Sequence, residues 1–583
     1  MAFPKEWGAG VFEVPLVIGV TSHRNLSPDE VGPIGERIGE FFAQLKREFP
    51  HMPLVVLSAL AEGGDQLAAR EALVAGARLI APLPLPVATY AEDFVDPASR
   101  ACFEELCARG DVLQMPLMPG NEGADIERPG EARDRQYGQA GVFIASHCHI
   151  LLALWDGRDS NLLGGTAQVV RYALDGIMPG WIERRRSERP VLNRVDESIV
   201  YHIACSRVGA DGVVLKPATP LAPLQLRWLS QEQSRDAATG MQPEFRRMFA
   251  HMREFDFDQR RYADEILAGA NQAGVDMFPD NDHSVIDRLF CAADALAIHF
   301  QKRVTWTMRS LHVLAAVTGI VFVCYADLPA GFSWRSGIYA FIALFILGGF
   351  VSWLARQRDW HRKYIDYRAL AEGLRVQRCW RRAGVTTINP SVFAHDHFMQ
   401  KTDLDLGWIR NVMRVPSMER IGDAPVPDWA LESVIADWIG EIGVGGQLDY
   451  YNRKTDQRAR MQRTTGALVR GSLWLSFGTV LFLALFQDWL GSDTTALLLA
   501  VLAVVGILAA ARESYAYRKG DKELIKQYRY MLGIFADARR KIDAEPDNAG
   551  KRRILRALGE AAMSEHAEWA LMHRQRPLDN ARL

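Results

Sequence analysis

Residues 310–326 read SLHVLAAVTGIVFVCYA, a stretch that contains no Asp, Glu, Lys or Arg. Residues 337–355, 471–487 and 494–511 share this composition, and short loops join the stretches into two pairs. As helices they would each be about 25 to 29 Å long, near the roughly 30 Å hydrocarbon layer of a bilayer. The pattern predicts four transmembrane helices in two hairpins. Buried core helices of a soluble protein are the alternative reading.

The residues around the four stretches favour the membrane. Trp334, Tyr339, Trp353, Trp474 and Trp489 stand near the ends of the stretches, where amphipathic rings prefer the headgroup layer. Arg and Lys gather before the first and third stretches and after the second and fourth, while the two hairpin loops together hold one Arg and no Lys. The positive-inside rule therefore predicts that both termini and the middle region are cytoplasmic.

Each hairpin continues into a charged helical stretch with aromatic residues, at 361–384 and at 512–542, which indicates an internal duplication. We expect an α/β ligand-sensing domain and then an all-α region with long cytosolic helices. The expected regions are 1–225 (sensing domain), 226–309 (helical connector), 310–384 (first hairpin and cytosolic helix), 385–465 (cytosolic connector) and 466–583 (second hairpin and C-terminal helices).

The composition narrows the function classes. A chain of 583 residues is too long for one core, and its net charge of -2 argues against a protein that wraps nucleic acid, so no nucleic-acid partner is expected. The seven cysteines are scattered and form no C-x-x-C pair, which fits a reducing cytosol. The first thirty residues do not resemble a signal peptide.

The N-terminal region alternates strand and helix patterns. Residues 14–26, VPLVIGVTSHRNL, predict a buried strand at 14–20, a turn, and a helix from about Ser27. Further strand patterns follow at 53–60, 78–86 and 149–157, each ahead of a turn or helix. This order predicts a Rossmann-like parallel sheet, in which ligands settle beyond the carboxyl ends of the strands.

The turns at those strand ends are suited to a phosphate. Two glycine pairs allow close backbone approach at the start of a helix, although such turns also serve as plain connections. Hydroxyl groups and an Arg fork add donors, whereas G-x-G-x-x-G and Walker A patterns are absent from the sequence, which disfavours an ordinary NAD site or ATPase. The predicted ligand-binding residues are Gly19, Thr21, Ser22, His23, Arg24, Ser58, Glu62, Gly63, Gly64, Asp65, Pro84, Trp155, Asp156, Gly164, Gly165 and Thr166.

The stretch 57–90, LSALAEGGDQLAAREALVAGARLIAPLPLPVATY, resembles the central motif of the SLOG superfamily, which includes DprA and the lonely-guy nucleotide phosphoribohydrolases. WDG at 155–157 and GGTAQVV at 164–170 resemble its second phosphate loop, so the resemblance covers about the first 200 residues. The rest resembles duplicated SLATT-type two-helix transmembrane effector domains, and ALGEAAMSEHAEWALMHRQRP at 557–577 is similar to their closing helix.

This resemblance implies a membrane effector of bacterial anti-phage defence. The SLOG part would sense a nucleotide-derived second messenger, ADP-ribose-like or a cyclic nucleotide, and the membrane part would form a pore or disrupt the inner membrane as a homo-oligomer. A ligand-independent channel or transporter stays open as an alternative.

One departure bears on catalysis. The lonely-guy enzymes follow their glycine loop with paired glutamates, whereas here Thr166 is followed by Ala167, Gln168 and Val169. A carboxylate is missing where hydrolysis needs one, so we favour binding and assign no catalytic residue. A membrane-anchored nucleotide hydrolase that uses Glu62 or Asp65 stays open.

A metal site is one interpretation of the sequence His147, Cys148 and His149, because imidazoles and thiolates coordinate metal ions. On a strand, the two imidazoles would share one face. The sequence offers no third ligand, so no metal site is predicted.

Overall fold

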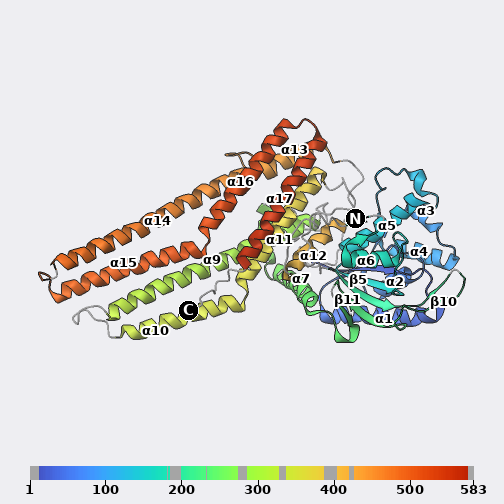
Figure 1. The fold of residues 1–583 in the computed structure, drawn as a ribbon, viewed down its shortest axis with the longest axis horizontal. Coiled ribbons are helices and arrows are strands. Elements are labelled where there is room, and N and C mark those ends of the chain that lie inside the picture. Colours follow the sequence, from blue (N-terminus) through green and yellow to red (C-terminus); the bar gives the residue numbers. More distant parts are fainter. Residues whose placement is uncertain are drawn as a thin grey trace. The chain divides into compact units, whose positions relative to one another are not determined.

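The computed structural model describes residues 12–179, 182–183, 198–209, 211–231, 233–272, 285–326, 336–385, 404–418, 426–486 and 488–574. The chain divides into two compact units (Figure 1). We call Met1–Ala292, Gly373–Arg378 and Thr386–Ala424 the sheet unit, and Ala293–Glu372, Cys379–Val385 and Pro425–Leu583 the helical unit.

An eight-stranded sheet forms the centre of the sheet unit in the described residues. Six neighbouring strands run parallel, and two antiparallel strands extend one edge. This confirms the predicted α/β class. The order across the sheet is β12 (Ser234–Asp236), β11 (Leu226–Leu229), β8 (Ile199–Ala204), β5 (Ile150–Trp155), β1 (Leu16–Ser22), β2 (Leu54–Leu57), β3 (Arg78–Leu83) and β4 (Asp111–Gln114).

Helices connect and cover the strands. After β1, the helix α1 (Pro28–Glu48) begins behind Ser27, with a proline in its first turn, where the missing N–H is not needed. Its apolar residues recur every three or four positions, and Ile34, Ile38 and Phe41 are buried. The further helices are α2 (Gly64–Val74), α3 (Val87–Ala91), α4 (Pro97–Arg109), α5 (Glu131–His147), α6 (Thr166–Asp175), α7 (Pro243–Arg261) and α8 (Ala263–Gln272).

The strand order reverses between β1 and β5. From β1 the chain moves outward through β2 and β3 to β4, then returns to β5 on the other side of β1. Such a reversal, the topological switch point, opens a crevice at the carboxyl ends of the two central strands. The ends of β1 and β5 therefore position the candidate site.

Several predicted elements need correction. The strand β1 extends to Ser22, so Thr21 and Ser22 are its last residues and do not belong to the turn. β4 was not predicted, and residues 226–236, which the charge pattern predicts as helical, contain β11 and β12. His147 is the last residue of α5 and does not lie on a strand with His149, so the shared face does not exist.

A short helix from the region between the hairpins belongs to the sheet unit. In α12 (Gly407–Arg414), Arg414 donates to the carbonyl of Cys148 at 3.0 Å, and the carbonyl of Asn411 lies 3.0 Å from Nε2 of His149. Nδ1 of His149 accepts from the amide of Val17 at 3.1 Å. Burial lowers the pKa of His149 to about 3, so this imidazole is neutral and links β1 to α12. The predicted connector 385–465 is thus shared between the two units.

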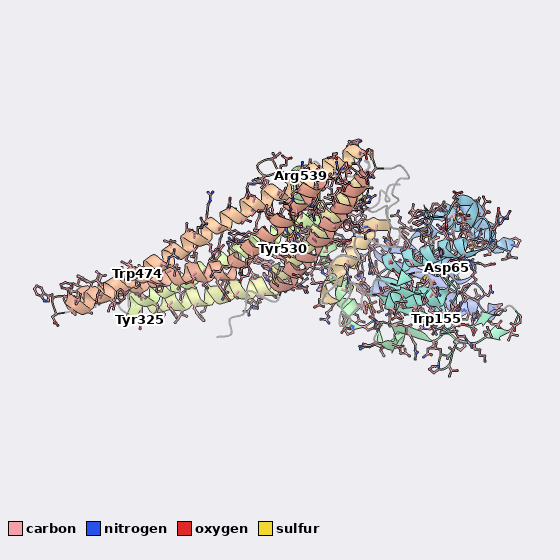
Figure 2. The ribbon with its side chains drawn as sticks, turned by 45° about the horizontal axis from the view of Figure 1, so that its top comes forward. Asp65, Trp155, Tyr325, Trp474, Tyr530 and Arg539 are labelled. Atoms are coloured by element: carbon pink, nitrogen blue, oxygen red, sulfur yellow. The ribbon has the colours of Figure 1, made fainter. Side chains whose placement is uncertain are left out.

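The helical unit contains the apolar segments of four long helices. In the described part of the chain, α9 (Val285–Ala326), α10 (Gly337–Gln357), α14 (Gly446–Phe486) and α15 (Ser492–Arg518) include segments long and apolar enough to cross a membrane. At most 17 % of each apolar window is buried within the chain. Core helices would show the reverse, so this exposure favours a lipid environment over the buried-core alternative. Figure 2 labels Trp474 on α14, where 74 % of the residue is exposed.

The two hairpins are followed by helices of matching length. α9, α10 and α11 (Trp360–Ala383) have 42, 21 and 24 residues, and α14, α15 and α16 (Asp521–Ala544) have 41, 27 and 24. α13 (Asp428–Val434) precedes α14, and α17 (Asn548–Arg574) packs along α11, where Arg574 holds the buried Asp366 at 2.9 and 3.0 Å. In both sets a helix of more than 40 residues comes first and a helix of 24 residues comes last, while the middle helices differ by six residues.

The hairpins contact each other through α9 and α15. A Cβ on Gly319 would lie 3.2 Å from the side chain of Ile507, which shows close helix packing. Farther along the same pair, Arg309 donates to the Tyr515 hydroxyl at 3.4 Å, and His312 and Ser514 lie 3.4 Å apart. Phe322 and Phe341 join α9 to α10, with ring centroids 5.7 Å apart.

Candidate functional site

Two helix N-termini meet at Ser22, the last residue of β1. At the start of α2, a Cβ on Gly64 would lie 2.7 Å from Cβ of Ser22, so the helix begins against this strand end. At the start of α6, the Thr166 hydroxyl donates to the carbonyl of Ser22 at 2.7 Å. Because α2 follows β2 and α6 follows β5, the two helices bring their positive ends to the switch point from both sides of β1.

Four backbone amides at these helix starts have no acceptor among the described residues. They belong to Asp65 and Gln66 of α2 and to Thr166 and Ala167 of α6. The amide of Gly64 instead donates to the His23 carbonyl at 3.4 Å. Oε1 of Gln168, in the first turn of α6, is also buried without a described partner. Free amides at two converging helix starts form an arrangement that binds phosphate or carboxylate.

The backbone geometry of the turns before α2 and α6 requires glycine at one position in each. Gly63 has φ of +86°, and a Cβ there would lie 2.0 Å from the carbonyl oxygen of Arg24. Gly164 has φ of +73°, and its Cβ would lie 2.8 Å from the amide nitrogen of Gly138 in α5. Gly165 has an ordinary φ of -70° and serves as the N-cap of α6. The first two positions therefore combine a left-handed backbone with a close backbone approach.

Asp65 is buried between α2 and β1. Its carboxylate accepts from the Ser22 hydroxyl at 2.6 Å. Burial raises the pKa of Asp65 to about 6, although the hydrogen bonds from Ser22 and from the Ala61 amide, and the charge of Arg24, act in the opposite direction. This carboxyl group therefore gains and loses a proton near neutral pH. Figure 2 labels Asp65 and Trp155 in the sheet unit.

Asp156, directly after β5, is also buried, and His23, Arg158 and Arg207 surround it. Arg207 donates to it at 2.8 Å, the Arg158 amide donates at 3.0 Å, and Nε2 of His23 lies 3.2 Å away. Burial alone would raise the pKa of Asp156, but the nearby His23 ring and the hydrogen bonds from the Arg158 amide and Arg207 lower it to about 2. Nε2 of His23 also accepts from the Asp156 backbone amide at 3.1 Å. Asp156 is therefore a permanent anion that anchors three basic residues beside the switch point.

Arg24 extends from the end of β1 over an aromatic ring. Its guanidinium carbon lies 5.6 Å from the ring centroid of Tyr137 in α5. The Tyr137 hydroxyl in turn contacts Asp93, which also pairs with Arg133. Burial, together with Asp93, raises the pKa of Tyr137 to about 12, so the phenol stays protonated. Tyr137 also hydrogen-bonds the guanidinium, so it orients Arg24 and leaves the other donors of the group for a ligand.

The structure brings some predicted residues together and separates others. Ser22, His23, Arg24, Gly63, Gly64, Asp65, Asp156 and Thr166 contact one another around the ends of β1 and β5. The hydroxyls of Ser22 and Thr166 bond within the chain, and that of Ser58 accepts from Leu60 at 3.1 Å. These three hydroxyl groups are thus engaged within the chain, and the backbone amides at the two helix starts are the donors left for a ligand.

Four predicted residues lie apart from this cluster. Gly19 lies inside β1, where a Cβ would meet Ile144 of α5 at 2.8 Å, so it serves helix packing. Pro84 follows β3, two strands away from β1. Thr21 is buried within β1, opposite Ala153 of β5. Trp155 ends β5, and its indole donates to the Arg158 carbonyl at 3.0 Å.

Sequence reasoning missed Asp93, Arg158 and Arg207. Arg158 stands two residues after Asp156, a signal that the WDGR sequence offered. Arg207 reaches the site because β8 lies next to β5, an adjacency that the sequence does not specify. Among the described residues, no group of three or more His, Cys, Asp or Glu side chains could hold a metal ion.

Comparisons with family models, with curated proteins and with solved structures found no match to this chain. The functional argument therefore depends on the geometry of the chain itself.

Proposed function

We propose that the sheet unit binds a phosphate-bearing, nucleotide-derived ligand at the switch point, and that its occupancy controls the membrane helices of the same chain. The observation that carries this proposal is the convergence of the α2 and α6 N-termini on Ser22, with four unpartnered amides. Helix dipoles and free amides favour an anion there, and Arg24 adds a charged donor. An ADP-ribose-like compound or a cyclic nucleotide has suitable chemistry.

The state of Asp65 makes binding sensitive to protons. An ionised Asp65 would repel a phosphate, whereas the protonated carboxyl could donate a hydrogen bond to it. Because the pKa of Asp65 is already about 6, a nearby anion would raise it further and the site would take up a proton on binding. Asp156 keeps its charge and holds His23 and Arg207 in place.

The resemblance to the SLOG and SLATT families supplies the proposed output. On that basis we place the chain in the bacterial inner membrane with cytoplasmic termini, as a homo-oligomer that forms a pore or disrupts the bilayer in anti-phage defence. The positive residues beside the apolar stretches support this orientation. Ser472, Ser476 and Thr479 of α14 are half-buried, whereas most of their neighbours are exposed. A pore would therefore need several chains.

Ligand-dependent leakage from vesicles tests this function. The purified chain is reconstituted into vesicles that contain a fluorescent dye, and ADP-ribose, cyclic AMP and other nucleotides are added singly. We expect at least one nucleotide to accelerate dye release. Arg24→Gln should raise the required concentration about tenfold or more, since a hydrogen bond to a charged group contributes about 1.5 to 3 kcal/mol.

Arg100→Gln provides the matched control. Arg100 is an exposed arginine on α4 that pairs with Glu104 on its own helix. This variant should leak as the wild type does. Leakage that no nucleotide changes would remove the gating proposal, and full leakage without any nucleotide would favour a ligand-independent channel or transporter.

A membrane-anchored nucleotide hydrolase is the second candidate, favoured by the raised pKa of Asp65 beside the anion-binding amides. A carboxyl group that titrates near neutral pH can act as a general acid or base. Chromatography of nucleotides incubated with the chain would detect released base or sugar phosphate. Release that disappears in Asp65→Asn, or in Glu62→Gln, would support this candidate, whereas a nucleotide that binds and is recovered intact would exclude it.

A further inference from the structure

Each apolar helix has one end at a hairpin loop and one end away from it, and an arginine stands at each end away from the loop. We call these ends the hairpin bases. At each base the first charged residue beyond the apolar stretch is an arginine, whereas three of the four loop ends begin with an aspartate, at 327, 488 and 493. The four base arginines are Arg309, Arg356, Arg470 and Arg512.

These arginines lie on exposed helix surface. All four are exposed within the chain, and no ion pair within the described residues engages Arg309, Arg470 or Arg512. The contact between Arg309 and Tyr515 brings the bases of α9 and α15 to the same level, although Glu513 and Asp359 add two negative charges nearby. The bases therefore present several guanidinium groups beside the predicted hydrocarbon boundary.

An exposed tryptophan accompanies the arginine on three of the helices. Trp306 precedes Arg309 by three positions, Trp353 precedes Arg356 by three, and Trp474 follows Arg470 by four. Residues at these spacings share one face of a helix. The tryptophans are 55 %, 50 % and 74 % exposed. Indole rings prefer the headgroup layer of a bilayer, which sets the depth at which the guanidinium groups would lie.

We propose that the hairpin bases bind the phosphodiester headgroups of anionic phospholipids. Each tryptophan would anchor at the interface, and the arginine one turn away would donate two parallel hydrogen bonds to a phosphate. The negative surface of a leaflet rich in phosphatidylglycerol would add long-range attraction. This surface is independent of the nucleotide site and does not require that any ligand gates the chain.

Replacing the base arginines with lysines distinguishes lipid binding from a role in membrane topology alone. The positive-inside rule is satisfied by either residue, because it counts charge. Bidentate phosphate binding depends on the planar guanidinium, which an ammonium group does not reproduce. A variant with all four base arginines changed to lysine therefore keeps the charge and loses the fork.

Lipid retention by the full chain tests the proposal. The chain is reconstituted in vesicles of equal phosphatidylglycerol and phosphatidylcholine, extracted in mild detergent and purified, and its bound lipids are quantified by mass spectrometry. We expect about fivefold enrichment of phosphatidylglycerol in the wild type. The variant with Arg309→Lys, Arg356→Lys, Arg470→Lys and Arg512→Lys should retain less than half of that enrichment.

The control carries Arg540→Lys and Arg553→Lys, which change exposed arginines on α16 and α17, outside the spans. It should retain the wild-type enrichment, and inorganic phosphate in the wash should not displace the lipid. Bound lipid in the vesicle ratio, enrichment unchanged in the base variant, or displacement by phosphate would each overturn the proposal.

Discussion

The turn after β2 and the turn after β5 meet at the same strand end, yet the pKa values of their aspartates are shifted in opposite directions. Asp65 has one hydroxyl and one amide as partners, and burial raises its pKa to about 6. Asp156 also has almost no exposed surface, but it is less strongly desolvated than Asp65 and faces His23, Arg158 and Arg207, and its pKa falls to about 2. Desolvation raises the pKa of both groups, but less for Asp156, whose several hydrogen-bond donors together outweigh it. The aspartate of one turn can exchange a proton near neutral pH and that of the other cannot.

The largest expected effect concerns the backbone of the turn after β2. Gly63→Ala should destabilise the sheet unit by about 4 kcal/mol, because a left-handed backbone and a collision with the Arg24 carbonyl add together. Urea unfolding of the full chain, followed by near-ultraviolet circular dichroism, measures this.

Gly120→Ala is the control for that prediction. Gly120 also has a left-handed backbone, with φ of +90°, but nothing lies within 4 Å of its added Cβ. Gly120→Ala should lower the free energy of unfolding by about 1 to 2 kcal/mol. Equal costs at the two positions would show that the close approach at Gly63 does not matter.

Asp65→Asn should stabilise the sheet unit by up to about 3 kcal/mol at pH 8, because a pKa difference of one is worth about 1.4 kcal/mol. The folded pKa of about 6 lies above the ordinary value of 3.8, so the stabilising contribution of Asp65 is complete below pH 4 and is lost as the pH rises through 6. Unfolding between pH 4 and 8 should show this decline in the wild type and a flatter profile in the variant. A destabilised variant at pH 8 would contradict the assignment.

Asp156→Asn should act in the opposite direction, with a loss of about 2 kcal/mol at pH 7. Its folded pKa lies below 3.8, so its contribution is present above pH 4 and is lost as the pH falls through 2. The same unfolding experiment measures the loss. If both asparagine variants shifted stability in one direction, the contrast between the turns would fail.

Thr166→Val should have the smallest effect, about 1 kcal/mol, because it removes one neutral hydrogen bond to the Ser22 carbonyl. Thr239→Val is a suitable comparison, since its hydroxyl bonds an exposed carbonyl of Asp236 outside the site. Only Thr166→Val should also weaken nucleotide binding. Equal binding by both variants would show that the α6 start is not part of the site.

The sequence predicted the elements that carry strong local signals. The apolar stretches, the start of α1 behind Ser27 and the glycine turns follow from composition, capping and turn chemistry, and the structure has all of them. The strand β1 ends two residues later than its sequence pattern predicts, because Thr21 and Ser22 are typical turn residues but here pair with Ala153 and Leu154 of β5. β11 and β12 have only four and three residues, and they form strands because β11 pairs with β8 and β12 pairs with β11.

The sequence predicts only those parts of the site that carry a local signal. Ser22, Gly64 and Thr166 lie at strand and helix ends that local patterns reveal, so their meeting follows once the sheet is parallel. Arg207 contacts Asp156 only because β8 lies beside β5, and α12 joins the sheet unit from more than 250 residues away. Such long-range adjacency has no local signal in a single sequence.

Proton-linked nucleotide binding tests the central claim most directly. Isothermal titration of the detergent-purified chain with ADP-ribose, cyclic AMP and inorganic phosphate should show binding of at least one phosphate compound. Its affinity should weaken by up to about tenfold per pH unit above pH 6 in the wild type and stay constant in Asp65→Asn. No binding of any phosphate compound, or binding with the same pH dependence in both chains, would contradict the account.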